Sequence, residues 1–274
     1  MNSITGFSSG LYYEIAGEGH PLVLIHGGLV NSGLWDDQFV VFAGQYRTLR
    51  YDVRGFGQSK SPTSYYSNHG DLRDLLDYLG IERAYVLGLS MGGTIAIDFT
   101  LTYPDRVAAL LPIAAGVSGY RATANRALRD EMEAAYESGD KERAVELSLQ
   151  MWTDGPYRTP VQMDPTVRER IRAMTRHTFD LPDVEQWLQR LEPPAIDRLA
   201  EIHAPTLCVV GDQDVEDILK IGELIVTHVP GAQRAIIPGT AHHLNMEQPA
   251  AFNRVVLDFL NSLPHLAQPE RSDA

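Results

Sequence analysis

One short motif constrains the fold of this chain more than any other stretch: Gly88–Gly92 reads Gly-x-Ser-x-Gly. The apolar run Ala84–Leu87 precedes it like a buried strand, and Gly93–Phe99 follows it with the pattern of a helix. A serine on such a sharp strand-to-helix turn exposes its hydroxyl at the edge of a sheet, while the glycines keep the crowded turn free of side chains. The motif therefore predicts that Ser90 is a nucleophile between a parallel strand and a helix.

Strands and helices alternate along most of the chain. This alternation predicts an α/β fold, in which parallel strands form an open sheet with helices on both faces. We expect strands at residues 11–16, 21–25, 46–51, 84–87, 107–115, 205–210 and 234–237, and helices at residues 34–42, 72–79, 93–99 and 249–263.

The alternation stops between residues 117 and 195, where the chain is charged and helical in pattern. The stretch Arg129–Arg143 is dense in both signs of charge and is typical of a solvated helix face. Ligands of open α/β sheets bind at the carboxyl edge of the strands, so we expect this insertion to cover that edge as a lid. We predict a core at 1–116 and 196–263, a helical lid at 117–195 and a disordered tail at 264–274.

A nucleophilic serine needs a base, and the base needs an acid that orients it. Asp212 and Asp214 follow the strand at 205–210, and His242 and His243 follow the strand at 234–237. All four are expected at the same sheet edge as Ser90, in the chain order Ser, Asp, His that such folds use. The residues alone leave open which acid and which histidine take part.

Five motifs together resemble the α/β-hydrolase superfamily, and in particular its lid-bearing bacterial carboxylesterase and enol-lactone hydrolase branch, over residues 11–262. The resemblance implies a doubly wound, mostly parallel sheet of eight strands with the helical lid inserted after the sixth strand. The motifs stand in family order: His26-Gly27-Gly28 with Trp35, Asp52–Ser59, Gly88–Gly92, Gly211–Asp214 and His242–Pro249.

The resemblance favours one residue of each neighbouring pair. The spacing of the family histidine from a downstream glutamate, here Glu247, favours His242 over His243. The family pattern Gly-x-x-Asp favours Asp214 over Asp212, which is then interpreted as a turn residue. Glu247 itself is interpreted as a helix-start residue.

The oxyanion that forms when a serine attacks a carbonyl needs preorganised donors. The backbone N–H of Met91, the residue after the nucleophile, is expected to be one of them. The resemblance implies that the second is the N–H of Gly28, with Leu29 as the less favoured choice. His26 is expected to support this loop, and Asp52 and Arg54 are interpreted as structural, as is Trp35 in the core.

These residues predict a serine hydrolase that cleaves a carboxylic ester or lactone of a small to medium apolar substrate through an acyl-enzyme intermediate. Ser90 attacks, His242 moves the proton and Asp214 holds the imidazole. We predict that Leu29, Met151, Trp152 and His243 line the substrate pocket. The apolar lid residues either line that pocket or pack the lid helices together: Met132, Met151, Trp152, Met163, Met174 and Trp187.

Other activities remain open. The same three residues serve carbon–carbon bond hydrolases of dienoate ring-cleavage products, whose anionic substrates meet an arginine, and cofactor-free perhydrolases. A non-catalytic ligand receptor is the least favoured alternative. Epoxide hydrolases and dehalogenases of this fold use aspartate where this chain has Ser90. The arginines of the lid considered for an anionic substrate are Arg126, Arg158, Arg176 and Arg190.

The composition limits the kinds of partner that this chain is expected to bind. The net charge of −13 argues against nucleic acid or an anionic membrane surface, and no apolar stretch is long enough to cross a bilayer. The single cysteine, Cys208, lies in an apolar run and cannot form an internal disulfide, and no secretory signal is visible, so a cytoplasmic location is expected. We expect a monomer or a homodimer. The histidines lack a compact metal-ligand pattern, so we predict neither a metal nor a cofactor.

Overall fold

The computed structural model describes residues 3–264 and contains, within that range, one mixed sheet of eight strands. The order across the sheet is β1-β2-β4-β3-β5-β6-β7-β8. Along this order, the six strands from β4 to β8 are parallel to one another, whereas β2 is antiparallel to both β1 and β4. The strands are β1 (Ile4–Ser8), β2 (Leu11–Ala16), β3 (Pro21–Ile25), β4 (Arg47–Tyr51), β5 (Ala84–Leu89), β6 (Val107–Ile113), β7 (Leu207–Gly211) and β8 (Gln233–Ile237).

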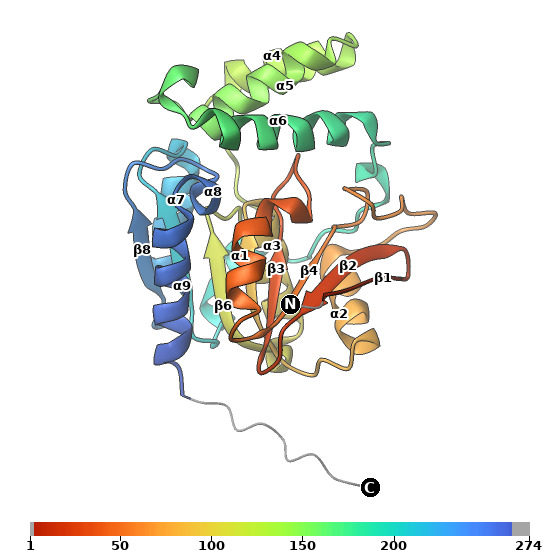
Figure 1. Cartoon of the computed structure of the whole chain (residues 1–274), viewed down its shortest axis with the longest axis vertical. Helices are drawn as coiled ribbons and strands as arrows, with labels where there is room; N and C mark the ends of the chain where they lie inside the picture. Colours follow the sequence, from red (N-terminus) through yellow and green to blue (C-terminus); the bar gives the residue numbers. More distant parts are fainter. Residues whose placement is uncertain (1–2, 265–274) are drawn as a thin grey trace, which may run out of the picture.

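Helices cover both faces of the sheet. Helices α1 and α9 pack together in front of the sheet in Figure 1, and α2 and α3 pack together behind it. Helix α7 packs against β7 and β8. The helices of this part are α1 (Asp36–Phe42), α2 (Asn68–Tyr78), α3 (Met91–Thr102), α7 (Glu216–His228), α8 (Leu244–Glu247) and α9 (Pro249–Ser262).

Between β6 and β7 the chain leaves the sheet. It forms α4 (Arg126–Glu137), α5 (Lys141–Ser148), a π-helical turn (Leu149–Asp154) and α6 (Pro165–Asp180). Figure 1 shows α4, α5 and α6 stacked over one end of the sheet. The predicted doubly wound, mostly parallel sheet of eight strands, with a helical lid after the sixth strand, is therefore confirmed.

Burial explains which strands the sequence revealed. All residues of β5, β6 and β7 are buried, and strands covered on both faces consist of continuous apolar runs. The edge strand β1 exposes Ile4 and Phe7 and lacks such a run, so the residue pattern did not predict it. Helix α7 was not predicted either, and the helix after the serine begins at Met91, two residues earlier than expected.

The predicted helix at 34–42 is a 3₁₀ turn (Ser32–Trp35) followed by α1, and Trp35 is fully buried against Phe252, as predicted for a core residue. None of the helices in the described range is long and apolar enough to span a membrane. Residues 265–274 of the predicted disordered tail lie outside the described residues.

Candidate active site

Ser90 occupies the turn between β5 and α3 in a strained conformation. Its backbone angles are φ 56° and ψ −113°, a region that residues other than glycine rarely adopt. The N–H of Ser90 donates to the carbonyl of Ile113 at 2.9 Å, and its carbonyl accepts from the N–H groups of Thr94 and Gly116 at 3.0 and 3.1 Å. Hydrogen bonds to β6 and α3 therefore hold the strained serine in place.

The glycines of the motif permit backbone-to-backbone contact around this turn. A Cβ on Gly88 would lie 2.0 Å from the carbonyl oxygen of Gly92. A Cβ on Gly92 would in turn lie 2.3 Å from the carbonyl oxygen of Ile25, at the end of β3. The turn can pack against β3 at this distance only because both positions lack side chains.

Asp214 and His242 meet at the carboxyl edge of the sheet. Asp214 follows β7 and His242 follows β8, and His242 Nδ1 donates to Asp214 Oδ2 at 2.9 Å. The other carboxylate oxygen accepts from the N–H of Val215 at 2.7 Å. Both side chains are almost completely buried. A proton held on Nδ1 leaves Nε2 of His242 as the basic nitrogen.

The two neighbouring candidates have different surroundings. Asp212 is exposed, and its Oδ1 accepts from the N–H of Gly239 at 2.7 Å, as a turn residue does. His243 Nδ1 lies 3.4 Å from the hydroxyl of Thr153 in the lid. Burial, with a smaller effect from His242, lowers the pKa of His243 to about 3, so this imidazole is neutral at physiological pH.

Ser90 and His242 line one cavity of about 590 Å³, a volume typical of small-molecule sites. In the part of the chain that the structure describes, Ser90 Oγ makes no hydrogen bond to His242. Such bonds are often long in unliganded sites and tighten when substrate binds.

The loop after β3 lies against the serine turn. A Cβ on Gly27 would lie 3.5 Å from Ser90 Cβ, and a Cβ on Gly28 would lie 3.9 Å from Met91 Cβ. Met91 is the first residue of α3, where backbone N–H groups lack helical partners. Gly28 and Met91 both line the cavity, as does Leu29, which has a positive φ of 61°.

His26 anchors this loop from below. Its Nε2 accepts from the N–H of Val53 at 2.9 Å, and its Nδ1 donates to the carbonyl of Gly27 at 2.7 Å. Burial lowers the pKa of His26, so the neutral ring is favoured. The Asp52 carboxylate accepts from two backbone N–H groups at 2.8 and 2.7 Å, and Arg54 forms a largely buried ion pair with Asp71 of α2 at 2.6 Å. All three residues therefore hold loops in place and do not face the cavity.

A sequence model of the alpha/beta hydrolase fold matches residues 20–249. The chain belongs to the α/β-hydrolase family. It is 30% identical over 262 residues, 91% of each chain, to the 2-hydroxy-6-oxononadienedioate/2-hydroxy-6-oxononatrienedioate hydrolase of Comamonas testosteroni. It is 27% identical to the carboxylesterase YbfK of Bacillus subtilis over 252 residues, 87% of this chain and 79% of that one.

The fold is shared with the enol-lactonase from Burkholderia xenovorans LB400, at a TM-score of 0.76 and 22% identity over 94% of this chain and 100% of that one. The predicted resemblance is thus confirmed at the level of the family, which includes the carboxylesterase and the dienedioate hydrolase named above.

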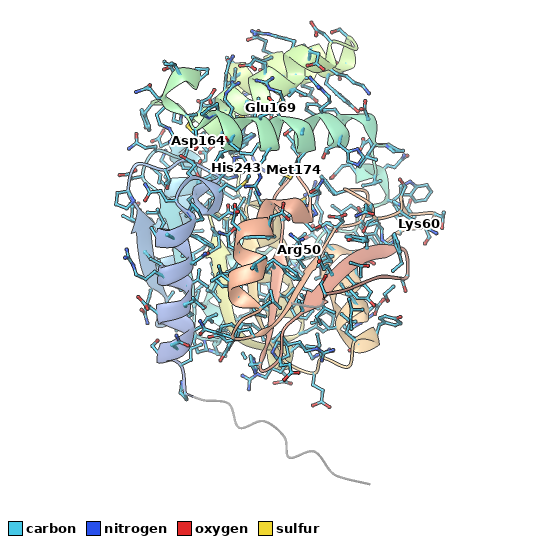
Figure 2. The ribbon with its side chains drawn as sticks, viewed as in Figure 1. Arg50, Lys60, Asp164, Glu169, Met174 and His243 are labelled. Carbon is cyan, nitrogen blue, oxygen red and sulfur yellow. The ribbon has the colours of Figure 1, made fainter. Side chains whose placement is uncertain are left out.

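The cavity of this α/β hydrolase lies between the lid and the sheet. The four residues predicted to line a pocket, Leu29, Met151, Trp152 and His243, all line it. Figure 2 shows His243 and Met174 between α6 and the core, although Met174 does not line the cavity. Of the six apolar lid residues considered, three line it and three do not; the latter are Met163, Met174 and Trp187.

Helix α4 supplies four cavity residues, of which only Met132 was among the lid residues considered from the sequence. Arg129, Met132, Glu133 and Tyr136 all line the cavity. Their spacing of three, four and seven residues places them on one helical face. The interpretation of this stretch as a solvated face is therefore wrong for that side of α4, and the paired Met132 and Tyr136 among charges were the available signal.

None of the four lid arginines considered for an anionic substrate lines the cavity, and each pairs with a carboxylate elsewhere. Arg129 does line it, and among the described residues it is the one arginine or lysine that does so. Its guanidinium carbon lies 5.8 Å from the ring centre of Trp152, and Nη2 lies 3.8 Å from Asp217 Oδ2. Its Nε is buried and has no hydrogen-bond partner in the described part of the chain.

The single cysteine of the chain, Cys208, does not line this cavity. Cys208 is buried in β7, and burial raises the pKa of its thiol to about 12, as expected of a core residue. Within residues 3–264, no cluster of three or more histidine, cysteine or acidic side chains has the arrangement needed to hold a metal ion.

Proposed function

We propose that this α/β hydrolase cleaves a carboxylic ester or lactone of a small to medium, mainly apolar substrate through an acyl-enzyme on Ser90. One observation carries the proposal. The strained Ser90 lines the same largely apolar cavity as His242, whose ring is hydrogen-bonded to the buried Asp214. Nucleophile, base and orienting acid thus come from three strand ends at one sheet edge.

The proposed reaction begins when His242 Nε2 takes the proton of Ser90 and Oγ attacks the substrate carbonyl. The N–H groups of Gly28 and Met91 stabilise the resulting oxyanion, each by about 3 kcal/mol. His242 then protonates the leaving alkoxide, and the acyl group remains on Ser90. Water attacks the acyl-enzyme with His242 again as base, which frees the acid, while Asp214 stabilises the imidazolium in both steps.

A substitution of the serine tests this proposal. Ser90→Ala is expected to abolish hydrolysis of a short-chain aryl ester, measured by release of the phenol. Ser148→Ala is the matched control, because Ser148 also lines the cavity and its loss is expected to leave the rate nearly unchanged. Full activity of Ser90→Ala would overturn the mechanism.

A second candidate function is hydrolysis of a carbon–carbon bond in an anionic dienoate. Arg129 favours it, because a cation with an unpartnered Nε lines the cavity and the relative from Comamonas testosteroni acts on a dioate. Comparison of kcat/KM for aryl esters, enol lactones and dienoate ketones separates the two functions. If the dienoate is the substrate, Arg129→Met is expected to lower its kcat/KM while sparing neutral esters, and the exposed Arg126→Met is the matched control.

We also propose that residues 117–195 form the lid and that residues 1–116 and 196–263 form the hydrolase core. The cavity supports this division, because its lining comes from both parts. The monomeric or dimeric state, the cytoplasmic location and the absence of nucleic-acid partners stay predictions from composition.

A further inference from the structure

One arginine of the lid is bonded to the loop that carries the histidine. Arg158 donates from Nε to the carbonyl of Asp154 at 2.8 Å and from Nη2 to the carbonyl of Thr153 at 2.9 Å, both within the lid. Its Nη1 donates to the carbonyl of Gly239, beyond β8, at 3.1 Å. A planar guanidinium can satisfy several fixed acceptors in this way, which an ammonium cannot.

Glu247 links Arg158 to the backbone next to His242 through two hydrogen bonds. Arg158 Nη1 donates to Glu247 Oε2 at 2.5 Å, and Glu247 Oε1 accepts from the backbone N–H of Ala241 at 2.9 Å. Ala241 directly precedes His242. Glu247 is the last residue of the single-turn helix α8 and stands two positions before α9 begins, and its two contacts were not predicted. The side chains of Arg158 and Glu247 are only 12% and 7% exposed, so water screens the pair little.

The lid backbone touches the same loops nearby. The ring of Trp152 lies against that of His242, with centroids 4.6 Å apart and the ring planes tilted by 39°. A Cβ on Gly155 would lie 2.7 Å from the carbonyl oxygen of Gln213 and 3.0 Å from Ala241 Cβ. The lid segment 152–158 therefore packs directly on the loops of both Asp214 and His242.

On the sheet side, the turn from Gly239 to His242 is held by two further bonds. Asp212 accepts from the N–H of Gly239 at 2.7 Å, and the N–H of Gln213 donates to the carbonyl of Thr240 at 2.9 Å. The bonds of Arg158 and Glu247 hold the same turn from the lid side. The backbone before the histidine is thus fixed between sheet and lid.

We infer that Arg158 and Glu247 are positioning residues that align His242 with Ser90 by fixing the backbone turn before it, so that a docked lid is a condition for an effective base. This inference rests on the proposed function for its kinetic consequence. The bonds themselves belong to the fold and can be tested without turnover.

The first test is kinetic. Arg158→Lys keeps the positive charge beside Glu247 but loses the planar fork, and small displacements of catalytic groups reduce rates by up to about 100-fold. We expect its kcat on a short-chain aryl ester to fall about tenfold or more, with KM within about threefold, since substrate contacts are unchanged. Arg170→Lys is the matched control, because Arg170 joins the lid to Asp37 of α1 at 2.9 Å and, among the described residues, is not bonded to the turn at 239–242.

A double substitution keeps the test valid if a single substitution at Arg158 causes misfolding. Arg158→Met with Glu247→Gln leaves no unpaired buried charge and is expected to fold, as judged by circular dichroism. Its kcat should fall at least as far as that of Arg158→Lys. Wild-type kcat in both variants, or an equal loss in Arg170→Lys, would overturn the inference.

The second test needs no turnover. The Nδ1 proton that His242 shares with Asp214 is expected to give a low-field proton NMR signal, assigned by its loss in His242→Gln. That signal should broaden or shift in the two Arg158 variants and persist in Arg170→Lys. An unchanged signal in both Arg158 variants contradicts the inference. If the wild type hydrolyses no ester while the signal still responds, the proposed function fails and the positioning role stands.

Discussion

At the scale of single residues, Asp212 and Asp214 have different surroundings although they stand only two positions apart in the chain. Asp214 is buried and bonded to His242, whereas Asp212 is exposed and bonded to the N–H of Gly239. The residue pattern left this choice open, because both acids follow the same strand. The family spacing favoured Asp214, and the hydrogen bonds agree with that preference.

This difference predicts unequal effects of the same substitution. Asp214→Asn places an amide against His242 Nδ1, which favours the wrong tautomer, and kcat is expected to fall on the order of 10³–10⁴-fold. Asp212→Asn still offers an oxygen to Gly239, so its kcat should stay within about threefold of the wild type. Steady-state kinetics on one aryl ester measures both, and comparable losses would contradict the assignment.

At the scale of elements, α3 and the turn before it depend on tight backbone contact. Gly88 faces the carbonyl of Gly92 at a distance that no side chain tolerates, whereas the space beside Gly28 is open enough for a methyl group. The packing of this turn therefore depends on glycine at position 88.

Alanine at these two glycines should have different costs. Gly88→Ala forces a Cβ against the backbone and is expected to lower the free energy of unfolding by about 1–3 kcal/mol or more. Gly28→Ala makes only an ordinary contact with Met91 and should fold nearly as stably as the wild type. Urea denaturation provides the comparison, and a stable Gly88→Ala variant would show that the turn can relax.

Helix α3 also carries a buried carboxyl group with an altered pKa. Burial raises the pKa of Asp98 from 3.8 to about 6, although Ser118 donates a hydrogen bond to it. Since the folded-state pKa is the higher one, the folded state binds more protons between these two values. The chain therefore loses stability as the pH rises from about 4 to about 6.

Asp98→Asn removes this charge and keeps an oxygen for Ser118. We expect it to raise the free energy of unfolding by about 2–3 kcal/mol at pH 7 and to have little effect near pH 4. Denaturation curves at both pH values measure the difference. A variant that is equally stable or less stable than the wild type at pH 7 would contradict the raised pKa of Asp98.

The elements also show what the sequence can reveal. The buried parallel strands were predicted because their apolar runs are continuous, and the serine turn because glycines flank Ser90 at two positions on either side. The contacts of Arg158 were beyond such reasoning, since Gly239 and Glu247 lie more than 80 positions away in the chain. Apart from Met132, the α4 face was missed because this helix is rich in charged residues.

At the scale of the whole molecule, a buried ion cluster stiffens the lid above the cavity. Arg168 of α6 bonds both carboxylate oxygens of Asp154 at 2.9 and 3.0 Å and reaches Glu146 of α5 at 2.6 Å. Asp154 is almost fully buried, and these acids raise the pKa of Arg168. The cluster ties the π-helical turn, which carries Trp152, to two lid helices.

Removal of this arginine should loosen the lid. Arg168→Met leaves the Asp154 carboxylate buried and unpaired, at an expected cost of about 3–5 kcal/mol. Arg176→Met, on the same helix, breaks only an exposed pair with Glu142 and should leave the stability nearly unchanged. Hydrogen exchange of lid and core peptides shows where protection is lost, and unchanged lid protection in Arg168→Met would contradict the prediction.

The central claim is that Ser90 is a nucleophile activated by His242 and Asp214 in one cavity of the folded molecule. Treatment with a fluorophosphonate, followed by peptide mass spectrometry, tests it most directly. We predict a single adduct on Ser90 in the wild type, none in Ser90→Ala, and much slower labelling in His242→Gln. A folded wild type that gives no adduct, or an adduct at another serine, would contradict the claim.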